Sequence, residues 1–168
     1  MNPSDLRELQ APLKEKYRAD PSAALITLRA EGRLGEGVTC RVETAKGLAE
    51  AGLHPATGGT GFEVCSGDML LQALAACAGV TLNAVATALG VTVTSGRVIA
   101  EGDLDFRGTL AVDKTVPVGF RDIRLRFAVA TDATPEQVEK LLQLTERYCV
   151  VYQTLRHSPA IQVSLERV

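Results

Sequence analysis

Residues 66–90 read SGDMLLQALAACAGVTLNAVATALG, and this stretch predicts one long helix that carries a single charge. Ser66 is the expected N-cap, Asp68 lies in the first turn, where a carboxylate suits the helix dipole, and Gly90 is typical of a helix end. Because the stretch is rich in Ala, Gly and Thr, holds two amide side chains and has no flanking cationic loop, it favours a buried core helix over a membrane span. Such a helix needs cover from other layers of the fold.

The composition bounds the remaining possibilities. A chain of 168 residues fits one domain with a real core. A net charge of −2, an aromatic content of 4% and the lack of Trp argue against nucleic acid as a partner. The polar start MNPSDLREL has no signal-peptide pattern, so we expect a cytoplasmic protein whose four cysteines are reduced rather than paired in a static disulfide framework.

Alternating apolar residues predict five strands. Residues 24–30 and 38–42 indicate a hairpin with its turn at 32–37, and Cys40 falls on the apolar face as a core residue. Later strands are expected over 98–106, 122–129 and 161–165. Between the hairpin and the long helix, residues 46–62 form a Gly-rich connection. The glycines of this connection fit no phosphate-binding motif, and its His54 has no zinc-ligand spacing.

Two further helices complete the order of elements. Residues 1–20 predict an N-terminal helical extension, with Ser4 as its cap, ahead of a single domain over 21–168. The motif from Thr134 to Gln137 is a capping box that opens a helix ending near Cys149. The order ββ-α-ββ-α-β, with mostly antiparallel strands, defines an α+β fold in which a sheet wraps the long buried helix. Because that helix is more apolar than one small sheet can cover, we expect a homodimer.

Two thiols could carry chemistry. Cys77, alone in an apolar helix, is more typical of a buried inert residue, whereas Cys149 follows Arg147 at a helix end, where the pKa of a thiol can fall. If the second helix docks beside Cys77, one thiolate could attack a peroxide O–O bond and the other thiol could resolve the sulfenic acid as a disulfide. A supporting cation could come from one of three arginines of the N-terminal hairpin: Arg29, Arg33 and Arg41.

A family resemblance sharpens this hypothesis. The segment GDMLLQALAACAGVTL resembles the central-helix motif of the OsmC/Ohr superfamily (osmotically inducible protein C and organic hydroperoxide resistance protein), and ERYCVVYQTL resembles the second cysteine motif of that family. The resemblance implies an OsmC-like domain, an intertwined homodimer with its sites at the subunit interface, and no metal or cofactor. It implies organic hydroperoxides as substrates and a dithiol, such as a protein-bound lipoyl group, as reductant.

Carried onto this sequence, the resemblance implies that Cys77 is the peroxidatic cysteine and Cys149 the resolving cysteine. It implies that Asp68 is the acidic residue at the start of the helix, where the family usually has Glu. Val150 stands where the family often has Pro. Cys65 has no counterpart in the motif, so it is either incidental or an extra redox thiol.

Two other functions compete with the peroxidase. A non-catalytic protein of the same fold could bind a small apolar ligand at the dimer interface, next to the apolar surroundings of Cys77. A hotdog thioesterase also wraps a long helix in sheet, but it needs more consecutive strands than are expected here, and no suitable His or Glu pair is present to activate water.

Overall fold

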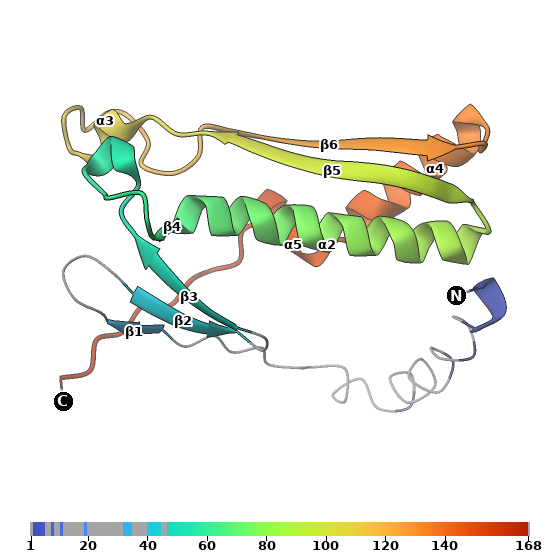
Figure 1. Ribbon diagram of the computed structural model, residues 1–168, viewed down its shortest axis with the longest axis horizontal. Helices are drawn as coiled ribbons and strands as arrows, with labels where there is room; N and C mark the ends of the chain where they lie inside the picture. Colours follow the sequence, from blue (N-terminus) through green and yellow to red (C-terminus); the bar gives the residue numbers. More distant parts are fainter. Residues whose placement is uncertain are drawn as a thin grey trace.

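The computed structural model describes residues 2–5, 8, 11, 19, 32–34, 40–44 and 47–167. A long helix, α2, lies beneath a ribbon of two long strands, β5 and β6, and two shorter helices, α4 and α5, pack on the same helix (Figure 1). A small sheet of four short strands, β1 to β4, leads into the start of α2. This arrangement is the predicted α+β fold, with the long helix at its centre.

Helix α2 spans Ser66–Leu89. Its N-cap is Cys65, so the prediction of Ser66 as the cap is wrong by one residue; the cap makes no side-chain hydrogen bond, and Ser66 is already helical. Asp68 lies in the first turn, as predicted. Gly90 ends the helix with a positive φ of 69°, which glycine adopts without strain, and its N–H donates to the carbonyls of the preceding turn.

One face of α2 forms the core. Leu74, Ala78, Leu82 and Val85 recur every three or four residues and are buried. They pack under β5 and against α4, whose Leu141 is 2% exposed. Among the described residues, α2 is also the one helix long and apolar enough to cross a membrane. Its packing here is that of a core helix.

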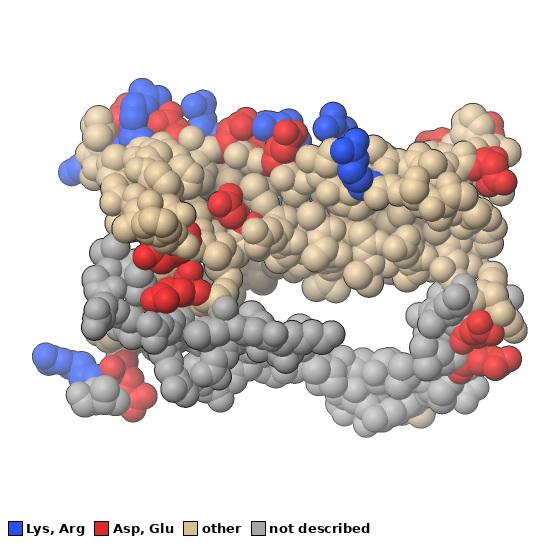
Figure 2. Space-filling model, viewed as in Figure 1, with Lys and Arg blue, Asp and Glu red and all other residues tan. Residues whose placement is uncertain are grey.

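The two long strands pair as predicted. β5 spans Val93–Asp103 and β6 spans Asp122–Thr131, and they are antiparallel, with Val98 opposite Phe127 and Glu101 opposite Arg124. One face packs on the helices, whereas Figure 2 shows acidic and basic side chains gathered along the β5–β6 layer; the surface below it is mostly uncharged, with a few acidic side chains on the left. Arg124 on β6 joins the two strands through an ion pair to Asp103 on β5, and it also pairs with Asp122 on its own strand.

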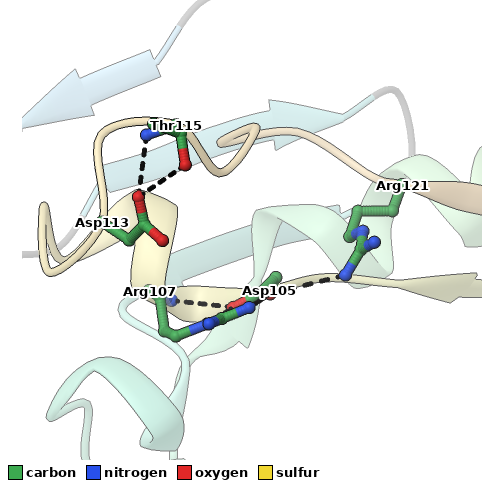
Figure 3. A network of polar contacts seen from close by, with 5 residues as sticks. All are labelled: Asp105, Arg107, Asp113, Thr115 and Arg121. Carbon is green, nitrogen blue, oxygen red and sulfur yellow. Dashed lines mark hydrogen bonds and ion pairs between the residues drawn. The ribbon is translucent and has the colours of Figure 1, made fainter.

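The connection between these strands differs from the sequence prediction. The first strand was expected to continue to Phe106, but β5 ends at Asp103 and a short helix, α3, spans Phe106–Thr109. Asp105 is the cause, because its carboxylate accepts from the backbone N–H of Arg107 and from the Arg107 guanidinium. Arg121 reaches the same carboxylate (Figure 3). The hydrogen bonds from Arg107 lower the pKa of Asp105 to about 2.

The N-terminal strands also depart from the predicted boundaries. β1 (Gly32–Leu34) occupies the predicted turn, β2 spans Cys40–Thr44, and β3 (Gly47–Gly52) occupies the predicted loop. β2 pairs antiparallel with both neighbours, and β3 pairs in parallel with β4 (Val64–Cys65). Pairing with β2 outweighs the weak strand propensity of these glycine-rich segments. The predicted strand 24–30 and the side chain of Cys40 lie outside the described residues.

A short 3-10 helix, η2 (Pro55–Thr57), follows β3. At the N-terminus of the chain, the side chain of Asn2 accepts from the N–H groups of Ser4 and Asp5, so Asn2 rather than the predicted Ser4 serves as the cap there. Most of the predicted 1–20 extension lies outside the described residues.

The C-terminal third contains both a confirmed helix and an unexpected one. α4 spans Pro135–Tyr148 and opens with the predicted capping box, in which Thr134 and Gln137 exchange hydrogen bonds. A second helix, α5 (Val150–Arg156), follows at once and was not predicted. The predicted strand over 161–165 is absent from this chain: residues 158–167 are not paired, and Ile161, Val163 and Leu165 are 83–91% exposed.

Candidate active site

Cys77 lies at the middle of α2, where small residues let neighbouring elements come close. Its thiol is half-buried. A Cβ added at Gly79, two residues on, would come within 3.5 Å of Val98 on β5, so the helix and the strand are in near contact here. The Thr81 hydroxyl donates to the Cys77 carbonyl at 2.8 Å.

Cys149 occupies the turn between α4 and α5 and is 1% exposed. It is the C-cap of α4 and the N-cap of α5, with extended backbone angles of φ −73° and ψ 107°. Its own N–H bonds back to the Thr145 carbonyl at 3.0 Å, and its carbonyl accepts from Gln153 at 2.9 Å. The first N–H groups of α5 have no partner within their own helix, so they are free to donate to a nearby sulfur.

The structure brings the two sulfurs together. Burial alone would raise the pKa of Cys77, but hydrogen bonds from the Val151 N–H, the Cys149 thiol and the Val150 N–H together lower it. Thr81 adds to this effect, although its one proton is also drawn to the Cys77 carbonyl. Donors that converge on one sulfur stabilise its thiolate.

The pKa of Cys149 shifts in the opposite direction. Burial raises the pKa of the Cys149 thiol, and its role as hydrogen-bond donor to Cys77 raises it further, against a backbone hydrogen bond from Tyr152. The expectation of a lowered pKa at Cys149, based on Arg147 and the helix end, is therefore wrong. Amides of α5 act on both sulfurs, but at Cys149 their effect is outweighed by burial and by the hydrogen bond that the thiol donates to Cys77.

The other predicted site residues are not gathered at this pair. Asp68 is exposed and lies nine residues before Cys77, which is about 13 Å along the helix axis. Arg33 and Arg41 face each other in backbone register on β1 and β2. Their side chains and all of Arg29 lie outside the described residues, and the main causes of the Cys77 shift include no cation from the described part of the chain.

Cys65 and His54 are placed elsewhere. Cys65 is half-buried at the N-cap of α2, twelve residues before Cys77. His54 caps η2 through its Nδ1, which accepts from the Ala56 N–H at 3.0 Å, and its ring stacks on Phe106. Both belong to the junction of sheet and helix rather than to the cysteine pair.

Sequence reasoning missed the backbone donors of the site. The N–H groups of Val150 and Val151 reach Cys77 only because the chain turns sharply at Cys149 and restarts as α5. The adjacent β-branched valines gave no signal of a helix start. Cys149 is not one of the usual capping residues and makes no side-chain cap hydrogen bond, so no local signal in the sequence marks the start of α5.

A cavity of about 750 Å³ lies next to the cysteine pair. Its lining is mainly apolar and comes from one face of β6, from α4 and α5, and from Leu74 and Leu82 on α2. Arg126, Glu146 and Arg156 also line it. Neither Cys77 nor Cys149 belongs to the lining. However, two lining residues lie within one helical turn of the cysteines: Leu74 is close to Cys77, and Tyr152 is close to Cys149.

The part of the chain that the structure describes holds no group of three or more His, Cys, Asp or Glu side chains suited to a metal ion. The cysteine pair itself can support the chemistry of two neighbouring thiols of unequal acidity.

Comparison with known proteins agrees with this fold. The family model of OsmC-like proteins matches residues 58–164, whereas a search of curated sequences finds no significant match. The chain superposes on an OsmC-like protein from Mycoplasma pneumoniae with a TM-score of 0.66 and 16% identity, covering 79% of this chain and 89% of the other.

Two organic hydroperoxide resistance proteins are also similar in structure. The protein from Elizabethkingia anophelis gives a TM-score of 0.62 at 17% identity, covering 80% of this chain and 91% of the other. The protein from Bacillus subtilis gives 0.53 at 19% identity, covering 79% and 93%. At these identities the likeness establishes the fold.

Proposed function

Because the chain belongs to the OsmC-like protein family, we propose that it is a cysteine-based peroxidase that reduces organic hydroperoxides. Cys77 is the peroxidatic cysteine and Cys149 the resolving cysteine. The observation that carries the proposal is the contact between the two thiols, in which backbone donors lower the pKa of one while burial raises the pKa of the other. Some structural relatives are named as organic hydroperoxide resistance proteins, which supports the same substrate class.

The reaction follows from the unequal thiols. The Cys77 thiolate attacks the distal peroxide oxygen; the S–O bond forms, the O–O bond breaks, and the alkoxide leaves as an alcohol after taking a proton from solvent. The Cys149 thiol then attacks the sulfenic sulfur. A disulfide forms, the S–O bond breaks, and hydroxide leaves as water with the proton of Cys149. An external dithiol, such as a lipoyl group, reduces the disulfide and becomes oxidised itself.

The homodimer is part of the proposal. Ala73, Ala76, Val80 and Asn83 form an exposed stripe on α2, spaced by three or four residues, which suits packing against a second helix. The C-terminal segment, whose alternating apolar side chains are exposed here, is suited to pair with a strand of the partner.

A role for Asp68 depends on this assembly. Since Asp68 lies about 13 Å along α2 from Cys77 in the same chain, a role for it at a sulfur requires a second subunit. The cation expected from the N-terminal hairpin would polarise the leaving oxygen. Thiols that cycle in this way work in a reducing compartment such as the cytoplasm.

The experiment is hydroperoxide consumption by the purified protein. Cumene hydroperoxide with a dithiol should be consumed catalytically, and Cys77→Ser should abolish the activity. Cys65→Ser is the matched control, because it changes another half-buried thiol, at the N-cap of the same helix, and leaves both Cys77 and Cys149 in place. Equal consumption by Cys77→Ser would sink the assignment.

A second candidate is a non-catalytic protein that binds a small apolar ligand. The large apolar cavity favours it, because the cavity lining contains neither cysteine and so does not need their chemistry. Native mass spectrometry of freshly purified protein tests this candidate. A retained apolar molecule, together with no turnover of hydroperoxide, would support it over the peroxidase.

A further inference from the structure

Three side chains of α5 converge on one residue of α4, Glu146. The Tyr152 hydroxyl donates to the Glu146 carboxylate at 3.3 Å and accepts from the Arg156 guanidinium at 2.8 Å. Arg156 also lies 3.9 Å from the same carboxylate. The Gln153 amide donates to the Glu146 backbone carbonyl at 2.7 Å. These contacts, which we call the Glu146 clamp, span the turn at Cys149.

The clamp lies at a turn where the backbone alone does not fix the direction of α5 relative to α4. At Cys149 the chain leaves helical angles, with ψ at 107°, so the helical ladder of α4 does not continue into α5. The Val150 side chain cannot anchor the start of α5, because it is 70% exposed. The direction of α5, and with it the direction of its first N–H groups, is therefore set by the packing of α5 on α2 and by side-chain contacts further along the helix.

Those N–H groups are the donors to Cys77. A thiolate gains from a backbone N–H only within hydrogen-bond distance and with good alignment, so a small rotation of α5 weakens the contact. We propose that the Glu146 clamp, made by Glu146 with Tyr152 and Arg156, is a positioning device that holds the N–H groups of Val150 and Val151 on the Cys77 sulfur. This proposal rests on the proposed function only in that the Cys77 thiolate is taken to react with a hydroperoxide.

The clamp acts through geometry and not through charge. The main causes of the Cys77 shift are its burial and the hydrogen bonds from Val151, Cys149, Val150 and Thr81. The other ionisable side chains on the elements packed against α2 are not among these causes, including Glu146, Arg147, Tyr152 and Arg156 on α4 and α5, and Arg97 and Glu101 on β5. A direct effect of the Glu146 carboxylate would disfavour a thiolate, so its removal would lower the pKa of Cys77. Loss of positioning raises that pKa, and the two explanations predict opposite signs.

The test uses two variants and one matched control. Tyr152→Phe removes only the hydroxyl that bridges Arg156 and Glu146, and Glu146→Ala removes the centre of the clamp. Tyr148→Phe is the control, since it makes the same change at a 59% exposed tyrosine on the last turn of α4 whose hydroxyl makes no hydrogen bond within the described residues.

The readout is the pKa of Cys77, from the pH dependence of iodoacetamide alkylation followed on the Cys77 peptide by mass spectrometry. Both clamp variants should raise this pKa by about 0.5–1, which leaves about three to ten times less thiolate at a pH below it, while Tyr148→Phe leaves it unchanged. Circular dichroism and the thermal midpoint establish that the variants are folded. A pKa that is unchanged in folded Tyr152→Phe, or lowered in Glu146→Ala, overturns the proposal.

The measurement also separates this inference from the proposed function. Alkylation requires no peroxide and no reductant, so the clamp can be tested in a protein that turns nothing over. A raised pKa in a protein without peroxidase activity would support the clamp and contradict the enzyme. Normal peroxidase activity, together with an unchanged pKa of Cys77 in both variants, would support the enzyme and contradict the clamp.

Discussion

Replacing Val150 by proline should raise the pKa of Cys77 while leaving the fold intact. Val150 is the first residue of α5, a position where proline is favoured because its fixed φ suits a helix start and the missing N–H has no intrahelical partner. Cys149, which would precede the proline, already has the extended angles that this requires. The lost side chain is 70% exposed, so little packing changes.

The magnitude follows from the single N–H that disappears. A hydrogen bond to a charged group contributes about 1.5–3 kcal/mol, and one pKa unit corresponds to about 1.4 kcal/mol, so a complete loss would raise the pKa by about 1–2. The Val151 N–H and the Cys149 thiol remain, and water reaches the half-buried sulfur. We therefore expect a rise of about 0.5–1.

The assay is again the pH profile of alkylation at Cys77. The midpoint should move upward, while the plateau at high pH should rise slightly, because a more basic thiolate is a better nucleophile. Val150→Ala is the matched control, since it removes the same side chain and keeps the N–H. An identical midpoint in Val150→Pro and Val150→Ala would refute the idea that this amide holds the thiolate.

Three further changes test other parts of the structure. Cys149→Ser should end multiple turnover but leave one equivalent of hydroperoxide reduced, with a sulfenic acid at Cys77 that dimedone traps. Leu141→Ala, at a core position 2% exposed, should lower the free energy of unfolding by about 2–5 kcal/mol in urea denaturation. Val163→Asp should shift the protein from dimer to monomer in size-exclusion chromatography; Ser164→Asp, on the other face of the same segment, should not.

The pKa shifts of Cys77 and Cys149 act on the pH dependence of stability in opposite directions. A thiol whose pKa is lower in the folded state than in the unfolded state contributes stability above the unfolded value, near pH 8.5, and loses it as the pH falls through the folded value. Cys149, with its raised pKa, contributes in the opposite direction. The alkylation profiles of the two thiols should accordingly have their midpoints on opposite sides of the ordinary value.

Local signals explain what could be predicted from the sequence. The capping box at Thr134, the terminating Gly90 and the apolar period of α2 act over a few neighbouring residues, and the structure contains all three. The alternation over 122–129 likewise predicted β6, because one face meets the helices and the other meets water. Two long helices and a pair of long strands were enough to indicate the α+β class.

Contacts between distant segments explain what was missed. β1 and β3 are strands because each lies beside β2, and their glycine-rich sequences give little sign of it. The segment 161–165 has a strand pattern but no partner within the described chain.

At the site, both cysteines were expected from the sequence, and its local signals for a lowered pKa lay at Cys149, where the structure raises the pKa instead. The acidity of each thiol depends on its burial and on which amides of α5 face its sulfur, and both follow from the turn at Cys149. The resemblance to a known family supplied the order of roles, with Cys77 first. The geometry of the donors is in accord with that order.

The most direct test of the central claim is the state of the two cysteines after one equivalent of cumene hydroperoxide. The reduced protein is treated, unreacted thiols are alkylated, and the chain is digested without reduction for mass spectrometry. The proposed mechanism predicts one new species in which the Cys77 and Cys149 peptides are joined by a disulfide, with Cys65 still alkylated. Recovery of both peptides in reduced, alkylated form would contradict it.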